Sequence, residues 1–344
     1  MVRDGAGSSA APRPVVTPGP TSAGRPSAGT AATTSDSASV VGRRRRLLRL
    51  GGSRGIIAGI AIDHRDSLRL MLERRGATGT STSDLRSLKL RLTRVLAPAA
   101  TAIMLDAELG GLALEAGAVP SSVALIMPLE AQGYETIGGG LTSTLLDDFS
   151  PTEALRYGAD ACKLLLPYRP DDLGSAARQE ALVSTTVAAC HELGLPLVIE
   201  PVVYRRPTET AAAYADAYRQ LLLGAVARLQ PLGADLLKLP FPVLDMRATT
   251  ESAALDACRT LGAACADTPW VLLGGGVDTD TFVEQIRLAG TAGAAGFLAG
   301  RGIWSAAIAS DADDAERIAR RVCRPDLERC REMAERVAKP LGAQ

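Results

Sequence analysis

The sequence predicts a single (β/α)8 barrel preceded by a disordered tail. Eight short apolar runs alternate with helical patterns over about 250 residues, which is the repeat of such a barrel. Most runs are continuously apolar, as expected for parallel strands covered on both faces. An open doubly wound sheet is the alternative, but no GxGxxG motif follows the first run. We therefore expect a tail at residues 1–50 and one barrel domain at residues 51–344.

The expected elements follow one another without a long gap. The sequence Ser150-Pro151-Thr152-Glu153 suits a helix N-terminus, because its serine can cap the helix and its proline and glutamate fall in the first turn. Gly194 suits a helix C-terminus. Strands are expected at residues 55–63, 101–105, 123–127, 163–166, 196–201, 235–239, 269–273 and 296–299. Helices are expected at residues 67–75, 84–96, 177–193, 211–229, 251–264, 279–292 and 314–337, with a further turn opening at Ser150.

Composition excludes several classes of protein. The formal net charge is zero, but residues 1–54 carry a net charge of +7, so the barrel is acidic and unlike a nucleic-acid-binding domain. No apolar run is long enough to span a membrane. Six scattered cysteines without a CxxC pair fit reduced thiols in the cytoplasm. Two histidines leave little basis for a metal site, so we expect neither metal nor cofactor. A homo-oligomer is left open.

Residues 1–50 are rich in Ala, Gly, Pro, Ser and Thr. Such a composition buries too little apolar surface to offset the entropy of ordering, which predicts disorder. The run Arg43-Arg44-Arg45-Arg46 could contact RNA, a membrane surface or an acidic partner, and a solvated linker is the commoner explanation. A start codon placed too far upstream would give the same pattern.

Lysine is rare in this chain, and two of its lysines lie in apolar strands. Only four of the 38 basic residues are lysines, and Lys163 and Lys238 fall in the fourth and sixth predicted strands. A lysine in apolar surroundings has a lowered pKa, and its free amine can act as a nucleophile, which arginine cannot. The alternative is that the stems cross apolar surface and the ammonium groups reach water.

Two acids accompany these lysines. Asp63 ends the first predicted strand, and Glu200 lies in the fifth, between the strands of Lys163 and Lys238. Reactive groups of such barrels project from the carboxyl ends of the strands, so the four side chains are expected to converge. The arrangement suits imine chemistry, with a carboxylate moving protons. Alternatively, Glu200 pairs with an arginine and Asp63 caps the following helix.

Glycines predict the other half of the site. Gly274-Gly275-Gly276 follows the seventh strand, and Gly300-Arg301-Gly302 follows the eighth. Loops at these two places commonly bind phosphate through backbone N–H groups, and Arg301 can grip a phosphate with two hydrogen bonds. The alternative for the triple glycine is a tight turn.

Collinear motifs in this chain resemble the class I aldolases grouped as tagatose-1,6-bisphosphate aldolase and sulfofructosephosphate aldolase, from about Gly55 to Trp304. The motifs are Ile62-Asp63-His64-Arg65, Cys162-Lys163-Leu164-Leu165, Ile199-Glu200-Pro201-Val202-Val203, Asp235-Leu236-Leu237-Lys238, Pro269-Trp270-Val271-Leu272-Leu273 and Ala294-Ala295-Gly296-Phe297-Leu298-Ala299-Gly300-Arg301-Gly302-Ile303-Trp304.

The resemblance implies a cytoplasmic, metal-independent aldolase acting on a small-molecule sugar phosphate. Lys238 would form a Schiff base with the ketose, Glu200 and Lys163 would serve acid–base and orienting roles, and Asp63 would lie beside the reacting hydroxyl. The dihydroxyacetone phosphate end would be held by Arg301 and the Gly274–Gly276 loop, with Gly300, His64 and Arg65 completing the substrate-binding residues.

Three departures from the family bear on the substrate. His64 stands where relatives have glutamine, Gly275 lies in a loop that usually contains serine, and Leu239-Pro240 replaces Val-Glu. The candidate substrates are tagatose 1,6-bisphosphate and 6-deoxy-6-sulfofructose 1-phosphate. The alternatives are an aldolase for another phosphorylated sugar and a catalytically silent sugar-phosphate sensor.

Overall fold

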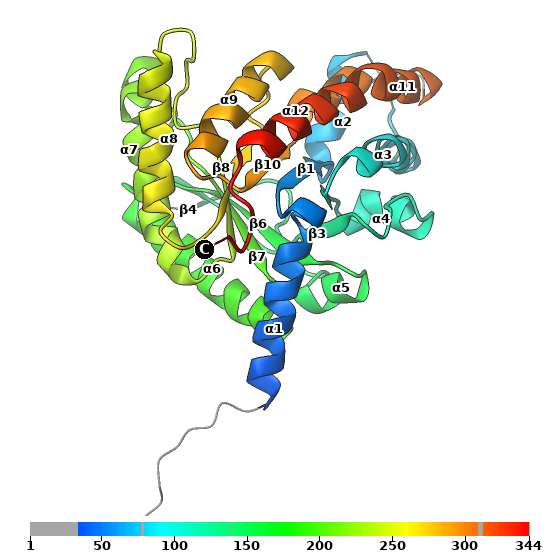
Figure 1. The fold of residues 1–344 in the computed structure, drawn as a ribbon, viewed down its shortest axis with the longest axis horizontal. Helices are drawn as coiled ribbons and strands as arrows, with labels where there is room; N and C mark the ends of the chain where they lie inside the picture. Colours follow the sequence, from blue (N-terminus) through cyan, green and yellow to red (C-terminus); the bar gives the residue numbers. More distant parts are fainter. Residues whose placement is uncertain (1–33, 77–78, 138, 309–311, 344) are drawn as a thin grey trace, which may run out of the picture. The chain divides into compact units, whose positions relative to one another are not determined.

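Eight parallel strands close into a barrel with helices around it (Figure 1). The structure is a computed structural model that describes residues 34–76, 79–137, 139–308 and 312–343. Around the barrel the order is β1, β10, β9, β8, β7, β6, β3 and β2. The barrel strands are β1 (Ile57–Ala61), β2 (Ala102–Met104), β3 (Ala124–Pro128), β6 (Ala161–Pro167), β7 (Leu197–Val202), β8 (Leu236–Leu239), β9 (Trp270–Leu273) and β10 (Gly296–Ala299). Each of the eight predicted runs overlaps one of them, which confirms the predicted fold.

The helices alternate with the barrel strands as expected. They are α1 (Thr34–Arg49), α2 (Asp66–Arg74), α3 (Thr82–Leu96), α4 (Ala107–Glu115), α5 (Pro151–Arg156), α6 (Leu173–Glu192), α7 (Ala211–Leu229), α8 (Glu251–Ala264), α9 (Thr279–Thr291), α10 (Arg301–Trp304), α11 (Ala312–Ile318) and α12 (Arg324–Val337). A π-helical stretch, Ala319–Cys323, joins α11 to α12. Within the described residues, no helix combines the length and apolar content that a membrane span requires.

Alternation along the strands decides which side chains point into the barrel. Leu236 packs in the barrel interior and Leu237 in the layer between strands and helices, so Lys238 points inward again. Lys163 lies two residues after Ala161, which also packs in the barrel interior, so Lys163 points inward. Glu200 lies two residues after the interior residue Val198 and points inward for the same reason. Asp63 follows Ala61 by two residues, just beyond the end of β1. Strand parity thus brings all four predicted catalytic side chains to one end of the barrel.

Helix α1 corrects the prediction of a disordered segment as far as residue 50. Residues 34–49 are helical, whereas residues 1–33 of the predicted tail lie outside the described residues. Arg43 forms an ion pair with Asp235 at 3.3 Å, and Arg49 forms one with Asp160 at 2.9 Å. These acids precede β8 and β6, so α1 lies at the amino end of the barrel, opposite the candidate site. Composition missed this helix because its stability comes from contacts with the barrel.

A small hairpin follows β3 and was not predicted. Its strands are β4 (Glu135–Ile137) and β5 (Gly140–Thr142), which pair antiparallel. At one end, the Gln132 Oε1 accepts a hydrogen bond of 3.0 Å from the Asp66 N–H. At the other, the Leu141 N–H donates to the Tyr204 hydroxyl at 2.9 Å. The hairpin is therefore tied to α2 on one side and to the segment after β7 on the other.

Candidate active site

A cavity of about 710 Å³ opens at the carboxyl ends of the barrel strands. Its floor holds Asp63, Lys163, Glu200 and Lys238, the four side chains predicted from the sequence to converge. Its wall includes His64, Gly274, Gly275, Gly300 and Arg301, which were predicted as substrate-binding residues. Burial of the two lysines is nearly complete, because Lys163 is 2 % exposed and Lys238 is 4 % exposed. The lysine stems therefore do not carry their ammonium groups out to bulk water.

Glu200 joins the two lysines. Its Oε2 atom lies 3.0 Å from the Lys238 Nζ and 3.3 Å from the Lys163 Nζ. Burial alone would raise the pKa of Glu200, but the two lysines lower it below its ordinary value. Glu200 is therefore a charged carboxylate that lies within 3.3 Å of both lysine Nζ atoms. Among the residues that the structure describes, it pairs with no arginine, which was the alternative considered from the sequence.

Lys163 lies among three carboxylates. Its Nζ is 3.2 Å from the Asp63 Oδ2 and also contacts Glu200 and Glu130. Burial would lower the pKa of Lys163, but Glu130, Glu200 and Asp63 raise it well above its ordinary value. Lys163 is therefore a protonated ammonium group, whereas the only carboxylate paired with Lys238 in the described structure is Glu200.

The two remaining acids of the cluster differ in their protonation. Burial would raise the pKa of Asp63, but Lys163, His64 and Lys238 hold it well below its ordinary value. For Glu130, burial raises the pKa more than contact with Lys163 lowers it. Asp63 is thus a fixed negative charge, and Glu130 is the member of the cluster that most readily accepts a proton.

His64 is a neutral imidazole at neutral pH. Burial lowers its pKa to about 4, with Arg301 adding to the effect and Asp63 opposing it. The ring packs edge-on against Trp304 with a centroid distance of 5.1 Å. Its Nδ1 lies 3.6 Å from the Asp63 Oδ1, too far for a hydrogen bond, and in the structure this buried nitrogen is unpartnered. His64 thus presents an unpartnered polar atom near the Asp63 carboxylate.

Two predicted substrate-binding residues lie away from the cavity. Arg65 is 4 % exposed and is not part of the cavity wall, and its Nη2 donates to the Glu130 carbonyl at 2.6 Å. Gly276 is also not part of this wall and has a φ of +79°. Arg65 therefore supports the backbone of Glu130, and Gly276 turns the loop that carries Gly274 and Gly275. The Gly274 N–H is already used by the Leu298 carbonyl at 3.2 Å.

The family model for DeoC/LacD family aldolases matches residues 57–306. The chain belongs to this aldolase family. It is an enzyme, a carbon–carbon lyase of the class I aldolase type, and its barrel is the fold on which that chemistry is built.

Similar proteins agree with this assignment. A tagatose 1,6-diphosphate aldolase of Listeria monocytogenes serotype 4a is 29% identical over 279 residues, covering 75% of this aldolase and 80% of the relative. Tagatose 1,6-diphosphate aldolase 1 of Enterococcus faecalis is 28% identical over 278 residues, covering 76% and 84%. A solved archaeal fructose-1,6-bisphosphate aldolase, whose catalytic lysine is bound to a carbinolamine intermediate, shares the fold with a TM-score of 0.58 and 18% identity, covering 85% and 99%.

Glu130 and Tyr134 were missed in the sequence. Glu130 follows β3 directly, contacts the Lys163 Nζ and accepts the Leu165 N–H at 3.2 Å. Its signal was present, because an acid directly follows the apolar run of the third strand in the sequence Met127-Pro128-Leu129-Glu130. Tyr134, directly before β4 of the unpredicted hairpin, lines the cavity and is half exposed. The segment after β3 therefore supplies part of this aldolase's site.

Proposed function

We propose that this aldolase forms a Schiff base through Lys238 and cleaves a ketose phosphate to dihydroxyacetone phosphate and an aldehyde. The observation that carries the proposal is the unequal number of carboxylates around the two buried lysines. Lys163 is surrounded by three carboxylates and stays protonated, whereas Glu200 is the only carboxylate paired with Lys238 among the described residues. A nucleophilic amine must be free of its proton, which favours Lys238 over Lys163.

Imine formation requires one proton acceptor close to the amine. The Nζ of Lys238 attacks C2 of the ketose and one amine proton passes to the carbonyl oxygen, which gives a carbinolamine. A second proton, taken up from solvent through Glu200, then protonates the carbinolamine hydroxyl, which leaves as water and gives the iminium. Glu200, 3.0 Å from the Lys238 Nζ, is placed to carry these protons. The nearby ammonium of Lys163 keeps Glu200 charged between transfers and attracts the developing negative charge on oxygen.

Carbon–carbon cleavage requires a second base. The C4 hydroxyl loses its proton as the C3–C4 bond breaks, and the bond's electron pair moves into the iminium to form an enamine. Burial raises the pKa of Glu130, which lines the cavity and suits this acceptor role, while the charged Asp63, 3.2 Å from Lys163, is placed to accept a hydrogen bond from the C4 hydroxyl. The aldehyde then leaves, C3 takes up a proton, and water hydrolyses the imine to free Lys238 and dihydroxyacetone phosphate.

The C1 phosphate is assigned to the side of the cavity formed after β9 and β10. Arg301 and Gly300 line the cavity there together with Gly275. In the described part of the chain, no carboxylate forms an ion pair with Arg301, so its guanidinium can take a phosphate. The two candidate substrates share this C1 phosphate: tagatose 1,6-bisphosphate, which appears in the names of the relatives, and 6-deoxy-6-sulfofructose 1-phosphate. Sugar phosphates are cytoplasmic metabolites, and we expect the enzyme to act there.

Borohydride trapping tests the proposal. Incubation with dihydroxyacetone phosphate and borohydride should reduce the imine to a stable amine and add the mass of the fragment to the peptide that contains Lys238. Lys238→Ala and Lys238→Arg should both lose the adduct and turnover, because neither side chain can attack a carbonyl. An adduct on Lys163 would exchange the two roles. Turnover without any adduct would rule out the Schiff base, and binding without turnover would favour a sugar-phosphate sensor.

A further inference from the structure

The wall of the cavity that faces Arg301 is neutral or acidic. Arg301 follows β10, and the barrel order places β6 directly across from β10, with β7 and β3 on either side of β6. From this side the cavity is lined by Gln132 and Tyr134 of the segment after β3, and by Tyr214 of α7. Together with Val202 and Val203 at the end of β7, and Val243 and Leu244 of the loop after β8, they form what we call the distal wall. A ketose held by Arg301 at its phosphate would point its other end toward this wall.

Each cation that lines the cavity already has a role in the proposed function or is paired with carboxylates. Within the described residues they are Lys163, Lys238 and Arg301. Lys163 is shared by three carboxylates, Lys238 is the proposed nucleophile, and Arg301 is assigned to the C1 phosphate. His64 is neutral at neutral pH. No cation of this lining is left for a second phosphate or a sulfonate.

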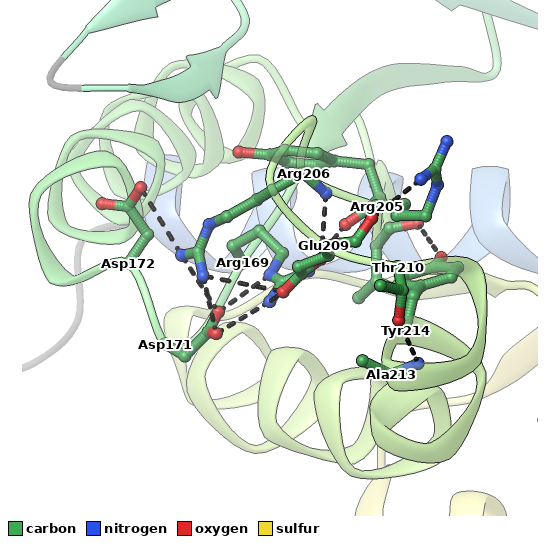
Figure 2. Close-up of polar contacts among 11 residues, drawn as sticks. Arg169, Asp171, Asp172, Arg205, Arg206, Glu209, Thr210, Ala213 and Tyr214 are labelled. Carbon is green, nitrogen blue, oxygen red and sulfur yellow. Dashed lines mark hydrogen bonds and ion pairs between the residues drawn. The ribbon is translucent and has the colours of Figure 1, made fainter.

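Two arginines near the same edge of the barrel, Arg169 and Arg206, are paired with carboxylates. Figure 2 shows Arg169 and Arg206 gathered around Asp171 and Glu209. The Arg169 Nη2 lies 2.6 Å from the Glu209 Oε1 and 2.8 Å from the Asp171 Oδ2, and the Arg206 Nη1 lies 3.0 Å from the same Asp171 oxygen. Neither arginine lines the cavity. Their charges hold the loops after β6 and β7 together and are not directed at a ligand.

The start of α2 does not supply an anion site either. Asp66, in the first turn, lines the cavity and places a carboxylate where an anion would approach. Its N–H is already donated to the Gln132 Oε1 at 3.0 Å. A second anionic group would therefore meet acid and aromatic surface, which costs free energy without a compensating partner.

We propose, on the basis of the function proposed above, that the aldehyde half of the substrate carries no phosphate or sulfonate. The enzyme would then act on a ketose 1-phosphate whose far end is a hydroxyl or a methyl group, and its aldehyde product would be uncharged. Tyrosine hydroxyls and the Gln132 amide suit hydroxyl groups, and the valines and Leu244 suit a methyl end. This substrate class differs from the bisphosphate in the names of the relatives.

Condensation kinetics test the proposal, because dihydroxyacetone phosphate is then common to every reaction. We would compare kcat/KM for D-glyceraldehyde and lactaldehyde with kcat/KM for D-glyceraldehyde 3-phosphate and sulfolactaldehyde. We expect the uncharged aldehydes to be preferred at least tenfold. Equal or better use of either charged aldehyde would overturn the proposal. The borohydride adduct with dihydroxyacetone phosphate alone is the independent check, since its absence would instead remove the proposed function and this inference with it.

Two variants make the test specific to the distal wall. Tyr134→Arg adds the missing cation, and should raise the relative kcat/KM for glyceraldehyde 3-phosphate at least tenfold, whereas the uncharged control Tyr134→Gln should not. If the ratio of kcat/KM for glyceraldehyde 3-phosphate to kcat/KM for glyceraldehyde is the same in the two variants, the far end of the substrate does not lie beside Tyr134. Arg247, an exposed residue of the loop after β8, does not line the cavity. Selective loss of activity toward the phosphorylated aldehyde in Arg247→Ala would identify it as a counter-cation and overturn the proposal.

Discussion

Replacing Lys163 by methionine tests the charge arrangement of the site, because this one ammonium group serves three carboxylates. Methionine has a similar length and no charge. Removing one partner of a buried ion pair costs about 3–5 kcal/mol of the free energy of unfolding. Since Lys163 is 2 % exposed and Asp63, Glu130 and Glu200 would be left with Lys238 alone, we expect the upper part of this range at pH 7.5.

The loss of stability should depend on pH in a defined direction. Without Lys163, the folded-state pKa of at least one carboxylate rises above its unfolded value of about 4. The folded variant then binds a proton that the unfolded chain does not, so its stability increases as the pH falls. The deficit relative to the wild type should shrink by about 1.4 kcal/mol per pH unit between pH 7.5 and pH 5 for each proton taken up. Urea unfolding at several pH values measures this.

Lys89→Met is the matched control for Lys163→Met. Lys89 is fully buried and paired with one carboxylate, Asp106, outside the cavity. Both variants should lose stability, but only Lys163→Met should lose turnover, by about 10²–10⁴ per folded molecule, while keeping the borohydride adduct on Lys238. A Lys163→Met protein as stable as the wild type at pH 7.5, with no pH-dependent difference, would refute the reasoning.

Two further predictions concern His64 and the amino-terminal helix. The pKa of His64 is about 4 in the folded protein, against about 6.5 in the unfolded chain. Between these two values only the unfolded chain binds a proton at this residue. The free energy of unfolding should therefore fall by up to about 3 kcal/mol as the pH is lowered toward 4. His64→Gln should remove this loss in urea unfolding at pH 7 and 4.5, and an unchanged pH dependence would contradict the assignment. Deleting residues 1–50 removes the fully buried Leu50 and should lower the free energy of unfolding by about 2–5 kcal/mol. Deleting residues 1–33 should leave the free energy of unfolding unchanged. Equal stability of the two truncated proteins would refute a supporting role for α1.

Strand parity made most of the catalytic cluster predictable. Lys163, Glu200 and Lys238 lie in apolar strands, and an ionisable residue there must point either into the barrel or into the helix layer. Side chains that point into the barrel lead to the cavity at its carboxyl end, and the structure has all three in it. Helix α4 was missed because Gly110 and Gly111 weaken a helical pattern. The hairpin was missed because its two strands are short and β4 is largely exposed.

The residues alone do not distinguish the two lysines: the family resemblance implied Lys238, and the structure supplies the contacts that favour it. In the sequence Lys163 and Lys238 look alike, since both follow apolar residues in a predicted strand. Their difference arises from neighbours on other strands: Asp63 from the end of β1 and Glu130 from the segment after β3 both reach Lys163, across distances of 100 and 33 residues in the chain. A rule that examines every residue just after an apolar strand would have found Glu130. It would not have assigned Glu130 to Lys163, because that depends on β3 and β6 being neighbours in the closed barrel, with Pro128 paired to Lys163. Barrel closure therefore determines which lysine is surrounded by three carboxylates, and this difference supports Lys238 as the proposed nucleophile.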